Sequence, residues 1–290
     1  MSDRILLIGA TGTTGTALAR ALHARGTGFR ALVREPGAAA ALAALDAELV
    51  PGDLGDPASI AAACAGVDRI YLAHAVHPDL RDWCRHVYTA AREAGVRHVV
   101  RLSAMRADPN SAVRLLQLHG LADEDLRASG LAWTILRPNA FMQNLLAQAA
   151  VIAASGSFYL PAGEARQSLI DARDVADVAA SVLADTTEHA SETYTLTGLE
   201  PLSYHDVAVA MRELLGAPVS YVPVREEDSR QALLDAGLPE WQAQAIAELQ
   251  AEFATGDFAR VTDKVSRLAG QPPRPLADFI ADYVQAFRGH

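Results

Sequence analysis

The sequence predicts an α/β protein in which a doubly wound parallel sheet is accompanied by a smaller, mostly helical C-terminal lobe. Three observations predict this class. Short β-rich runs alternate with helical stretches through the first half of the chain. The first run, Ile5–Ile8, is apolar at every position, as expected of a strand that is buried on both faces. After Leu202 the pattern becomes almost entirely helical.

The elements of the first half follow one another in βα order. Strands are predicted at Ile5–Ile8, Phe29–Val33, Ala47–Val50, Arg69–Ala73, His98–Ser103 and Ala132–Leu136. Helices are predicted at Thr13–Arg25, Pro57–Cys64, Pro78–Ala94 and Asn110–Ser129. Six strands in this alternation complete a doubly wound sheet.

The second half is less regular. Short strands are predicted at Ser157–Leu160, Gln167–Ile170 and Thr193–Thr197, the last as a candidate to return to the main sheet. Helices are predicted at Arg173–Leu183, Tyr204–Leu215, Asp228–Ala236, Glu240–Phe253, Ala259–Leu268 and Leu276–Phe287. We therefore expect a sheet domain over residues 1–155, joined by residues 170–198, and a smaller lobe over residues 199–290.

Composition limits the function classes. The 290 residues carry a formal net charge of −10, and no basic run favours binding to nucleic acid. No apolar run approaches the ~20 residues of a membrane span. The N-terminal residues Met1–Arg4 lead directly into the first strand, so we expect a cytoplasmic protein without a leader. Cys64 and Cys84 have neither metal nor redox spacing and are expected to be buried, and no metal site is predicted.

A glycine-rich loop follows the first strand and opens the first helix. Gly9 permits a tight turn, Gly12 lets backbone amides approach a pyrophosphate, and Gly15 allows close packing of the helix. The helix N-terminus adds unpaired N–H donors and the positive end of its dipole. A purely structural turn is the alternative, but the surrounding pattern favours a Rossmann-type dinucleotide site. Its hydroxyl donors would be Thr11, Thr13 and Thr14.

The end of the second strand bears on the choice of cofactor. An acidic residue there usually binds the ribose of NAD, whereas this chain places Arg34 first. A guanidinium suits a 2′-phosphate, so NADP(H) is expected in preference to NAD(H); a solvated arginine is the alternative. Glu35 is followed by Pro36 and is expected to turn outward. After the third strand, Asp53 either contacts the adenine beside Leu54 or caps the helix that starts near Pro57.

The usual acid–base pair of short-chain dehydrogenases is missing. That pair is Tyr-x-x-x-Lys, and the only lysine here is Lys264, which follows no tyrosine at that spacing. The helix after the fifth strand offers His119 instead, as a tentative proton donor or as a contact to the nicotinamide ribose. A histidine satisfied in the core is the alternative. Ala73 and His74 end the fourth strand and Ser103 ends the fifth, where ligands of such sheets bind.

Three groups of motifs resemble the NmrA-like family of atypical short-chain dehydrogenases. The first comprises the Gly-Ala-Thr-Gly-x-x-Gly loop, Leu-Val-Arg at Leu32–Arg34 and Gly-Asp-Leu at Gly52–Leu54. The second is the run Leu126–Asn144, which contains Arg-Pro-Asn-Ala-Phe-Met-Gln-Asn. The third comprises Ile170–Ala176 and the ending Leu268–Arg274. The resemblance spans nearly the whole chain.

The resemblance implies an NAD(P)H-binding protein. The family contains quinone and azo-dye reductases, reductases of plant phenolics, an imine reductase and regulators that bind NADP without turnover. It implies that Pro138, Asn139, Ala140 and Phe141 line the nicotinamide and substrate cleft, and that Phe141, Met142 and Asn144 contact the substrate. Packing of the following helix is the alternative reading of Phe141 and Met142. Many catalytic relatives carry a lysine on the helix that holds His119 here, which puts catalysis in question but not binding.

Two hypotheses remain. The first is an NADP(H)-dependent oxidoreductase that reduces a small conjugated acceptor such as a quinone, enone or iminium. Hydride addition to such an acceptor gives a stabilised product and reduces the need for a protein acid. The second is a non-catalytic NADP(H) sensor that reports to a protein partner. We expect a monomer or homodimer that binds a small-molecule substrate.

Overall fold

The computed structural model describes residues 4–289; the first three residues, on which the expectation about a leader depends, lie outside the described part. The chain forms two compact units. The first contains residues 1–112, 116–137 and 175–195, and the second contains residues 113–115, 138–174 and 196–290. None of the helices within residues 4–289 combines the length and the apolarity that a membrane crossing requires.

A seven-stranded sheet organises the first unit, in the order β3-β2-β1-β4-β5-β6-β8. The first six strands pair in parallel, and the order reverses between β1 and β4, as in a doubly wound Rossmann-like sheet. The predicted return of a late strand to this sheet is confirmed by β8. The strands are β1 (Ile5–Ile8), β2 (Phe29–Val33), β3 (Glu48–Pro51), β4 (Arg69–Leu72), β5 (His98–Leu102), β6 (Trp133–Pro138) and β8 (Glu192–Leu196).

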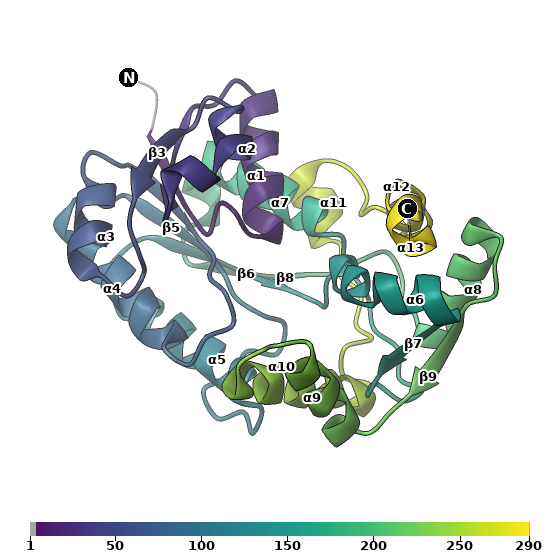
Figure 1. Ribbon diagram of the computed structural model, residues 1–290. Helices are drawn as coiled ribbons and strands as arrows, with labels where there is room; N and C mark the ends of the chain where they lie inside the picture. Colours follow the sequence, from purple (N-terminus) through teal and green to yellow (C-terminus); the bar gives the residue numbers. More distant parts are fainter. Residues whose placement is uncertain (1–3, 290) are drawn as a thin grey trace. The chain divides into compact units, whose positions relative to one another are not determined.

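Helices cover both faces of this sheet. Figure 1 shows α1, α2 and α7 on one face and α3, α4 and α5 on the other. Cys64 ends α3 and Cys84 lies in α4; both are free and fully buried, which confirms the expectation for them. The helical bounds are α1 (Thr13–Ala24), α2 (Ala40–Ala43), α3 (Pro57–Cys64), α4 (Leu80–Glu93), α5 (Arg114–Arg127) and α7 (Ala172–Ala184), with short 3-10 turns at Pro36–Ala38 and Thr187–His189.

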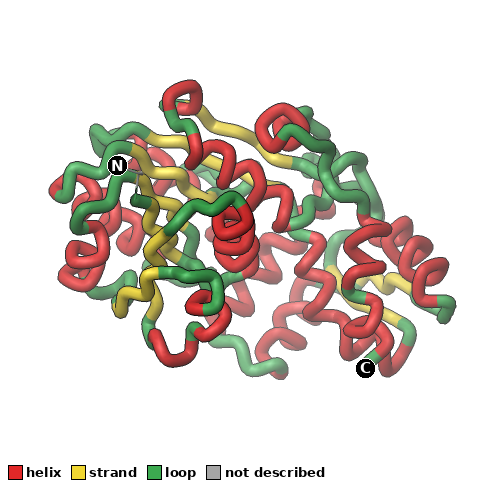
Figure 2. The backbone as a smooth tube through the Cα atoms, turned by 90° about the horizontal axis from the view of Figure 1, so that it is seen from above, coloured by secondary structure: helices red, strands yellow, loops and turns green. Residues whose placement is uncertain are grey.

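The second unit is mostly helical, as the red segments near the C-terminus in Figure 2 show. Its one small sheet pairs β7 (Ser157–Leu160) with β9 (Ser220–Pro223) in parallel. The helices are α6 (Ala149–Ser155), α8 (Tyr204–Leu215), α9 (Glu226–Asp235), α10 (Glu240–Glu252), α11 (Lys264–Ala269), α12 (Leu276–Asp282) and α13 (Val284–Arg288), with 3-10 turns at Met142–Gln148 and Phe253–Thr255.

Two predictions for the second unit were wrong, and one of its strands was not predicted. The expected strand at Gln167–Ile170 forms only isolated bridges, from Gln167 to Leu202 and from Ile170 to Phe141. Successive N–H groups there donate to different segments, so no ladder forms: Gln167 to Leu202, Ser168 to Phe258 and Ile170 to Ala140. The expected helix from Ala259 begins only at Lys264, since the Thr262 N–H donates to the Thr197 hydroxyl. Strand β9 was not predicted; only Tyr221 of its four residues is buried.

Candidate functional site

The glycine loop is tightly folded after β1. Gly9 has a positive φ of 80°, and a Cβ on it would lie 2.5 Å from the carbonyl oxygen of Ala73. A Cβ on Gly15 would lie 2.0 Å from the carbonyl oxygen of Gly9. Both positions therefore exclude a side chain, because a Cβ cannot approach backbone so closely. Gly15 brings the first turn of α1 against the loop itself.

The loop also presents unpaired backbone to the surface. Thr11, Gly12 and Thr13 are exposed, and Gly12 is the N-cap of α1 without a side-chain cap. The first N–H groups of that helix consequently have no intrahelical partner and point toward any anion bound there. Thr14 differs from its neighbours, because it is buried and its hydroxyl accepts from the Tyr71 hydroxyl at 3.0 Å. The side chain of Thr14 is thus used inside the fold.

Arg34 stands next to this loop at the end of β2. It is exposed and makes no ion pair or hydrogen bond with any residue in the range 4–289. The Gly52 N–H donates to the Val33 carbonyl at 3.0 Å, which places the turn after β3 beside Arg34. The Asp53 carboxylate accepts from the Gly55 N–H at 2.7 Å. The cap of α3 is Asp56, so Asp53 does not have the capping role that was its alternative.

A buried ion cluster lies behind the ends of β5 and β6. Arg101 and Asp123 are both fully buried and form an ion pair. The Asp123 carboxylate also accepts from Arg137 at 2.7 Å and from the Ser103 hydroxyl at 3.0 Å. Two guanidinium groups therefore share one carboxylate, and the cluster keeps one excess positive charge. Ser103 was expected near the nicotinamide, but its hydroxyl donates to Asp123 within this cluster.

The two histidines expected near the cofactor lie together above this cluster. His119 Nδ1 is 3.2 Å from Arg101 Nη2, and the His74 and His119 ring centroids are 5.3 Å apart. Desolvation and the Arg101 charge lower the pKa of His74 to about 3 and hold that of His119 well below its usual value. Both rings are neutral at pH 7. An imidazolium proton donor at His119 is therefore not favoured by its surroundings.

The residues that the family resemblance implied belong to the second unit. Asn139 is buried, and its amide donates to Ser168 and to the Phe258 carbonyl while its oxygen accepts from the Ala140 N–H. Its polar atoms are thus engaged within the unit. Pro138 and Met142 are buried as well, and Phe141 forms an isolated bridge with Ile170. Asn144 alone among these residues is exposed.

Sequence reasoning missed the central pair of the cluster, Arg101 and Asp123. A signal was present, since Arg101 interrupts an apolar strand and a charge in a strand buried on both faces requires a partner. The partner was not deducible, because Asp123 shares helix α5 with the acidic residues Glu124 and Asp125. Only the fold distinguishes the buried carboxylate from its solvated neighbours.

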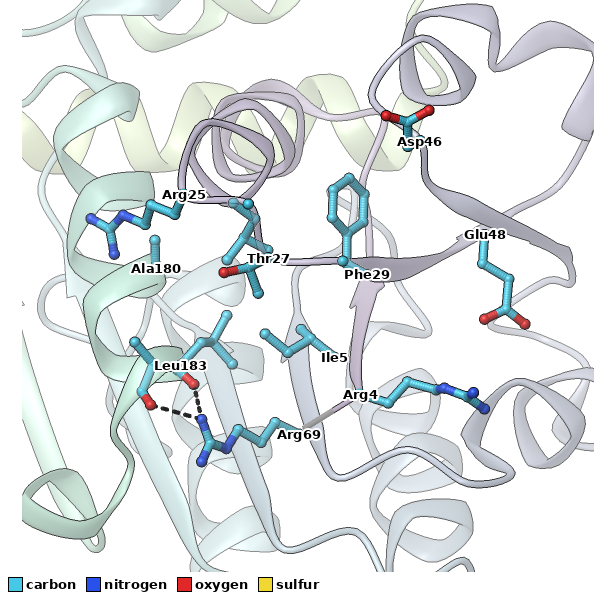
Figure 3. A pocket seen from close by; sticks show the side chains of 14 residues that line it. Arg4, Ile5, Arg25, Thr27, Phe29, Asp46, Glu48, Arg69, Ala180 and Leu183 are labelled. Carbon is cyan, nitrogen blue, oxygen red and sulfur yellow. Dashed lines mark hydrogen bonds between the residues drawn. The ribbon is translucent and has the colours of Figure 1, made fainter. Parts of the chain in front are cut away.

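A cavity of about 610 Å³ lies away from these residues, at the amino-terminal ends of the strands. Ile5 and Phe29 line it, whereas the glycine loop follows the opposite end of β1. Figure 3 shows Arg69 in this cavity with its guanidinium directed at the carbonyls that end α7, those of Leu183 and Ala184. That arginine caps a helix. The cavity is separate from the strand ends at which dinucleotides bind.

The fold and the loop define a dinucleotide-binding protein of the doubly wound class. The chain belongs to the NAD(P)H-binding family, whose model matches residues 9–186. An NAD(P)H azoreductase of Xenophilus azovorans is 38% identical over 283 residues, which is 98% of this chain and 99% of that protein. The expected NmrA-like, NAD(P)H-binding membership is confirmed.

Two solved structures extend the similarity to proteins with bound cofactor. The NADPH-dependent quinone oxidoreductase of Escherichia coli, complexed with NADPH, is 28% identical with a TM-score of 0.86. The triphenylmethane reductase of Citrobacter sp., complexed with NADP(H), is 26% identical with a TM-score of 0.83. Each similarity covers 96% of this chain and 99% of the other. These relatives are NAD(P)H-dependent oxidoreductases.

Proposed function

We propose that this protein is an NADPH-dependent reductase that transfers a hydride to a small conjugated acceptor such as a quinone, enone, iminium or azo compound. The observation that carries the proposal is the exposed Arg34, which has no partner among residues 4–289 and lies beside the exposed residues Thr11–Thr13 of the glycine loop. In support, the azoreductase similarity covers both chains almost completely. Bound NADPH would supply the hydride, and the chain would bind and orient the two reactants.

The preference for NADPH follows from the charge at the end of β2. A free guanidinium gains a charge-assisted, bidentate partner when a 2′-phosphate arrives. NADH offers only a hydroxyl there. The pyrophosphate would bind the N–H groups of Thr13 and Thr14 at the N-terminus of α1, because the Gly12 N–H already donates to the Gly9 carbonyl at 3.0 Å. Asp53 and Leu54 are proposed to border the adenine, beside the strand that carries Arg34.

The proposed class of acceptor follows from the lack of a protein proton donor near the two histidines, as far as residues 4–289 show. Neither a Tyr-x-x-x-Lys pair nor a charged imidazole stands at the ends of β4 and β5 within residues 4–289. A conjugated acceptor takes the hydride into a delocalised system, and its product takes a proton from solvent. We therefore propose that Phe141, Met142 and Asn144 shape a binding surface for a flat, conjugated molecule and that none of them transfers a proton.

The test begins with binding. NADPH, NADP⁺ and NADH are titrated by calorimetry against the wild type, Arg34→Ala and the matched surface control Arg20→Ala, since Arg20 is also exposed. We expect Arg34→Ala to weaken the binding of NADPH by about 10- to 100-fold, because a hydrogen bond to a charged group is worth about 1.5–3 kcal/mol. Affinity for NADH should change less than twofold, and the control should match the wild type.

Turnover is then measured as NADPH oxidation against a panel of quinones and azo dyes. Acceptor-dependent oxidation supports the reductase. Equal affinity of the wild type for NADPH and NADH would contradict the role of Arg34. Tight NADPH binding without turnover on any acceptor would instead favour an NADP(H)-sensing protein, the alternative raised by the missing catalytic pair.

A further inference from the structure

His74 and His119 are fixed in opposite tautomers by their neighbours. An arginine can only donate, so the 3.2 Å contact from Arg101 makes His119 Nδ1 an acceptor and leaves the proton on Nε2. A carbonyl can only accept, so the 3.2 Å contact of His74 Nδ1 with the Ala75 oxygen leaves the proton on Nδ1. One ring therefore offers an Nε2–H donor and the other an Nε2 lone pair.

Neither Nε2 atom is satisfied within residues 4–289. His74 Nε2 is buried without a hydrogen-bond partner, and among residues 4–289 the His119 ring has no hydrogen bond other than the one from Arg101. A buried, unpaired acceptor costs about 1–3 kcal/mol. A ligand that brings a donor to His74 and an acceptor to His119 removes this cost. Because the two rings lie 5.3 Å apart, the pair favours a ligand group that carries a donor and an acceptor close together.

The position of the two histidines relative to the sheet indicates which part of the dinucleotide they would contact. Arg34 ends β2, the glycine loop follows β1, His74 lies just beyond β4, and His119 lies on the helix after β5. The sheet order is β2-β1-β4-β5, so a dinucleotide whose 2′-phosphate meets Arg34 and whose pyrophosphate meets the loop continues toward the two histidines. The group that comes after the pyrophosphate is the nicotinamide ribose.

We propose that His74 and His119 form an acceptor–donor pair that binds the vicinal diol of the nicotinamide ribose, with Arg101 as the residue that positions the donor. One ribose hydroxyl accepts from His119 Nε2–H, and its neighbour donates to His74 Nε2. This inference rests on the proposed NADPH site.

The ribose is favoured over the nicotinamide carboxamide, which also carries a donor beside an acceptor. Ala73 packs directly against Gly9, and His74 is the next residue. The pair is therefore held close to the phosphate loop, and the ribose is the part of the nucleoside that adjoins the phosphate. His119 lies at the same place, because its ring centroid is 5.3 Å from that of His74.

The experiment compares ligands with and without the nicotinamide riboside. NADPH, adenosine 2′,5′-bisphosphate and the 3-acetylpyridine analogue of NADPH are titrated by calorimetry against His119→Leu, His119→Gln, His74→Leu and His74→Gln. His23→Leu, an exposed histidine on α1, is the matched control. Circular dichroism and a thermal melt establish that each variant is folded.

We expect each leucine variant to weaken the binding of NADPH by about three- to tenfold, the change that the loss of one neutral hydrogen bond produces. Binding of the bisphosphate should stay within twofold of the wild type, because that ligand lacks the riboside. The glutamine variants should recover most of the loss, since an amide supplies both a donor and an acceptor. A purely structural role would not produce that ligand-specific rescue.

Other outcomes overturn the inference. Equal weakening of NADPH and the bisphosphate would mean that the histidines only support the fold. The acetylpyridine analogue lacks the amide donor of nicotinamide. If His74→Leu weakens the binding of NADPH but not that of this analogue, His74 contacts the carboxamide and not the ribose. A failure of the proposed NADPH site is distinguishable from a failure of this inference, because Arg34→Ala would then leave the affinity for the bisphosphate unchanged.

Discussion

Asp123 is the residue on which the buried ion cluster depends. Its carboxylate is fully buried and accepts from Arg101, Arg137 and Ser103. A buried ion pair adds little compared with apolar packing, but removal of one partner leaves the other charge desolvated and unpaired. Without Asp123, the fully buried Arg101 guanidinium would lie near the Arg137 guanidinium with no carboxylate between them.

We predict that Asp123→Asn lowers the free energy of unfolding by about 3–5 kcal/mol, because Arg101 would be left buried without a counter-charge. Urea denaturation followed by circular dichroism measures the change. Asp125→Asn is the matched control on the same helix, since Asp125 pairs with the half-exposed Arg81. That partly solvated pair should contribute less than about 1 kcal/mol. Similar losses in both variants would contradict the argument.

At the level of single residues, the sequence predicted backbone roles better than side-chain roles. The glycines of the loop were identifiable because their spacing follows from the turn itself. The partners of Ser103, Thr14 and Asn139 were not, since each uses its polar group on a residue far away in sequence. The proximity of His74 to His119 likewise depends on how α5 packs after β5.

Helix α8 shows what local signals can determine. Its predicted bounds, Tyr204–Leu215, are the observed ones. Ser203 caps it by accepting from the Asp206 N–H, and Asp206 accepts in return from the Ser203 N–H, while Gly216 ends it in the left-handed conformation. The segment Gln167–Ile170 has no such signals. Its pairing is decided by distant segments, which a sequence pattern does not contain.

We predict that Ser203→Ala lowers the free energy of unfolding by about 1 kcal/mol, the usual cost of a lost N-cap. Ser203→Thr should restore most of it, because threonine keeps the hydroxyl acceptor. Thermal melts of the three proteins test this. An alanine variant as stable as the wild type would show that water replaces the cap at no cost.

For the molecule as a whole, neutral buried histidines link stability to pH. Desolvation and the nearby Arg69 lower the pKa of His98 to about 4, below the value of about 6.5 in an unfolded chain. Between these values the unfolded chain binds more protons than the folded one, so stability falls as the pH falls through 6.5 toward 4. His74 acts in the same direction. Burial raises the pKa of Asp174 to about 6, which acts in the opposite direction.

We predict that the wild type loses about 2 kcal/mol more than His98→Gln between pH 7.5 and pH 5.0, the loss expected for one histidine held neutral to pH 4. Urea denaturation at both pH values gives the four free energies. The comparison cancels the contributions of Asp174 and His74, which both proteins share. Parallel losses in the two proteins would show that His98 is not held neutral.

The two buried cysteines give the sheet unit an internal reporter. Cys64 and Cys84 lie on neighbouring helices, α3 and α4, and are the only thiols of the chain. A thiol reagent reaches them only when those helices open, and burial raises the pKa of the Cys64 thiol to about 11, which further slows its reaction. The rate of labelling under native conditions therefore follows how often this face of the sheet opens. A cofactor that binds only the folded sheet unit would lower that rate, so thiol labelling would report cofactor binding without any turnover.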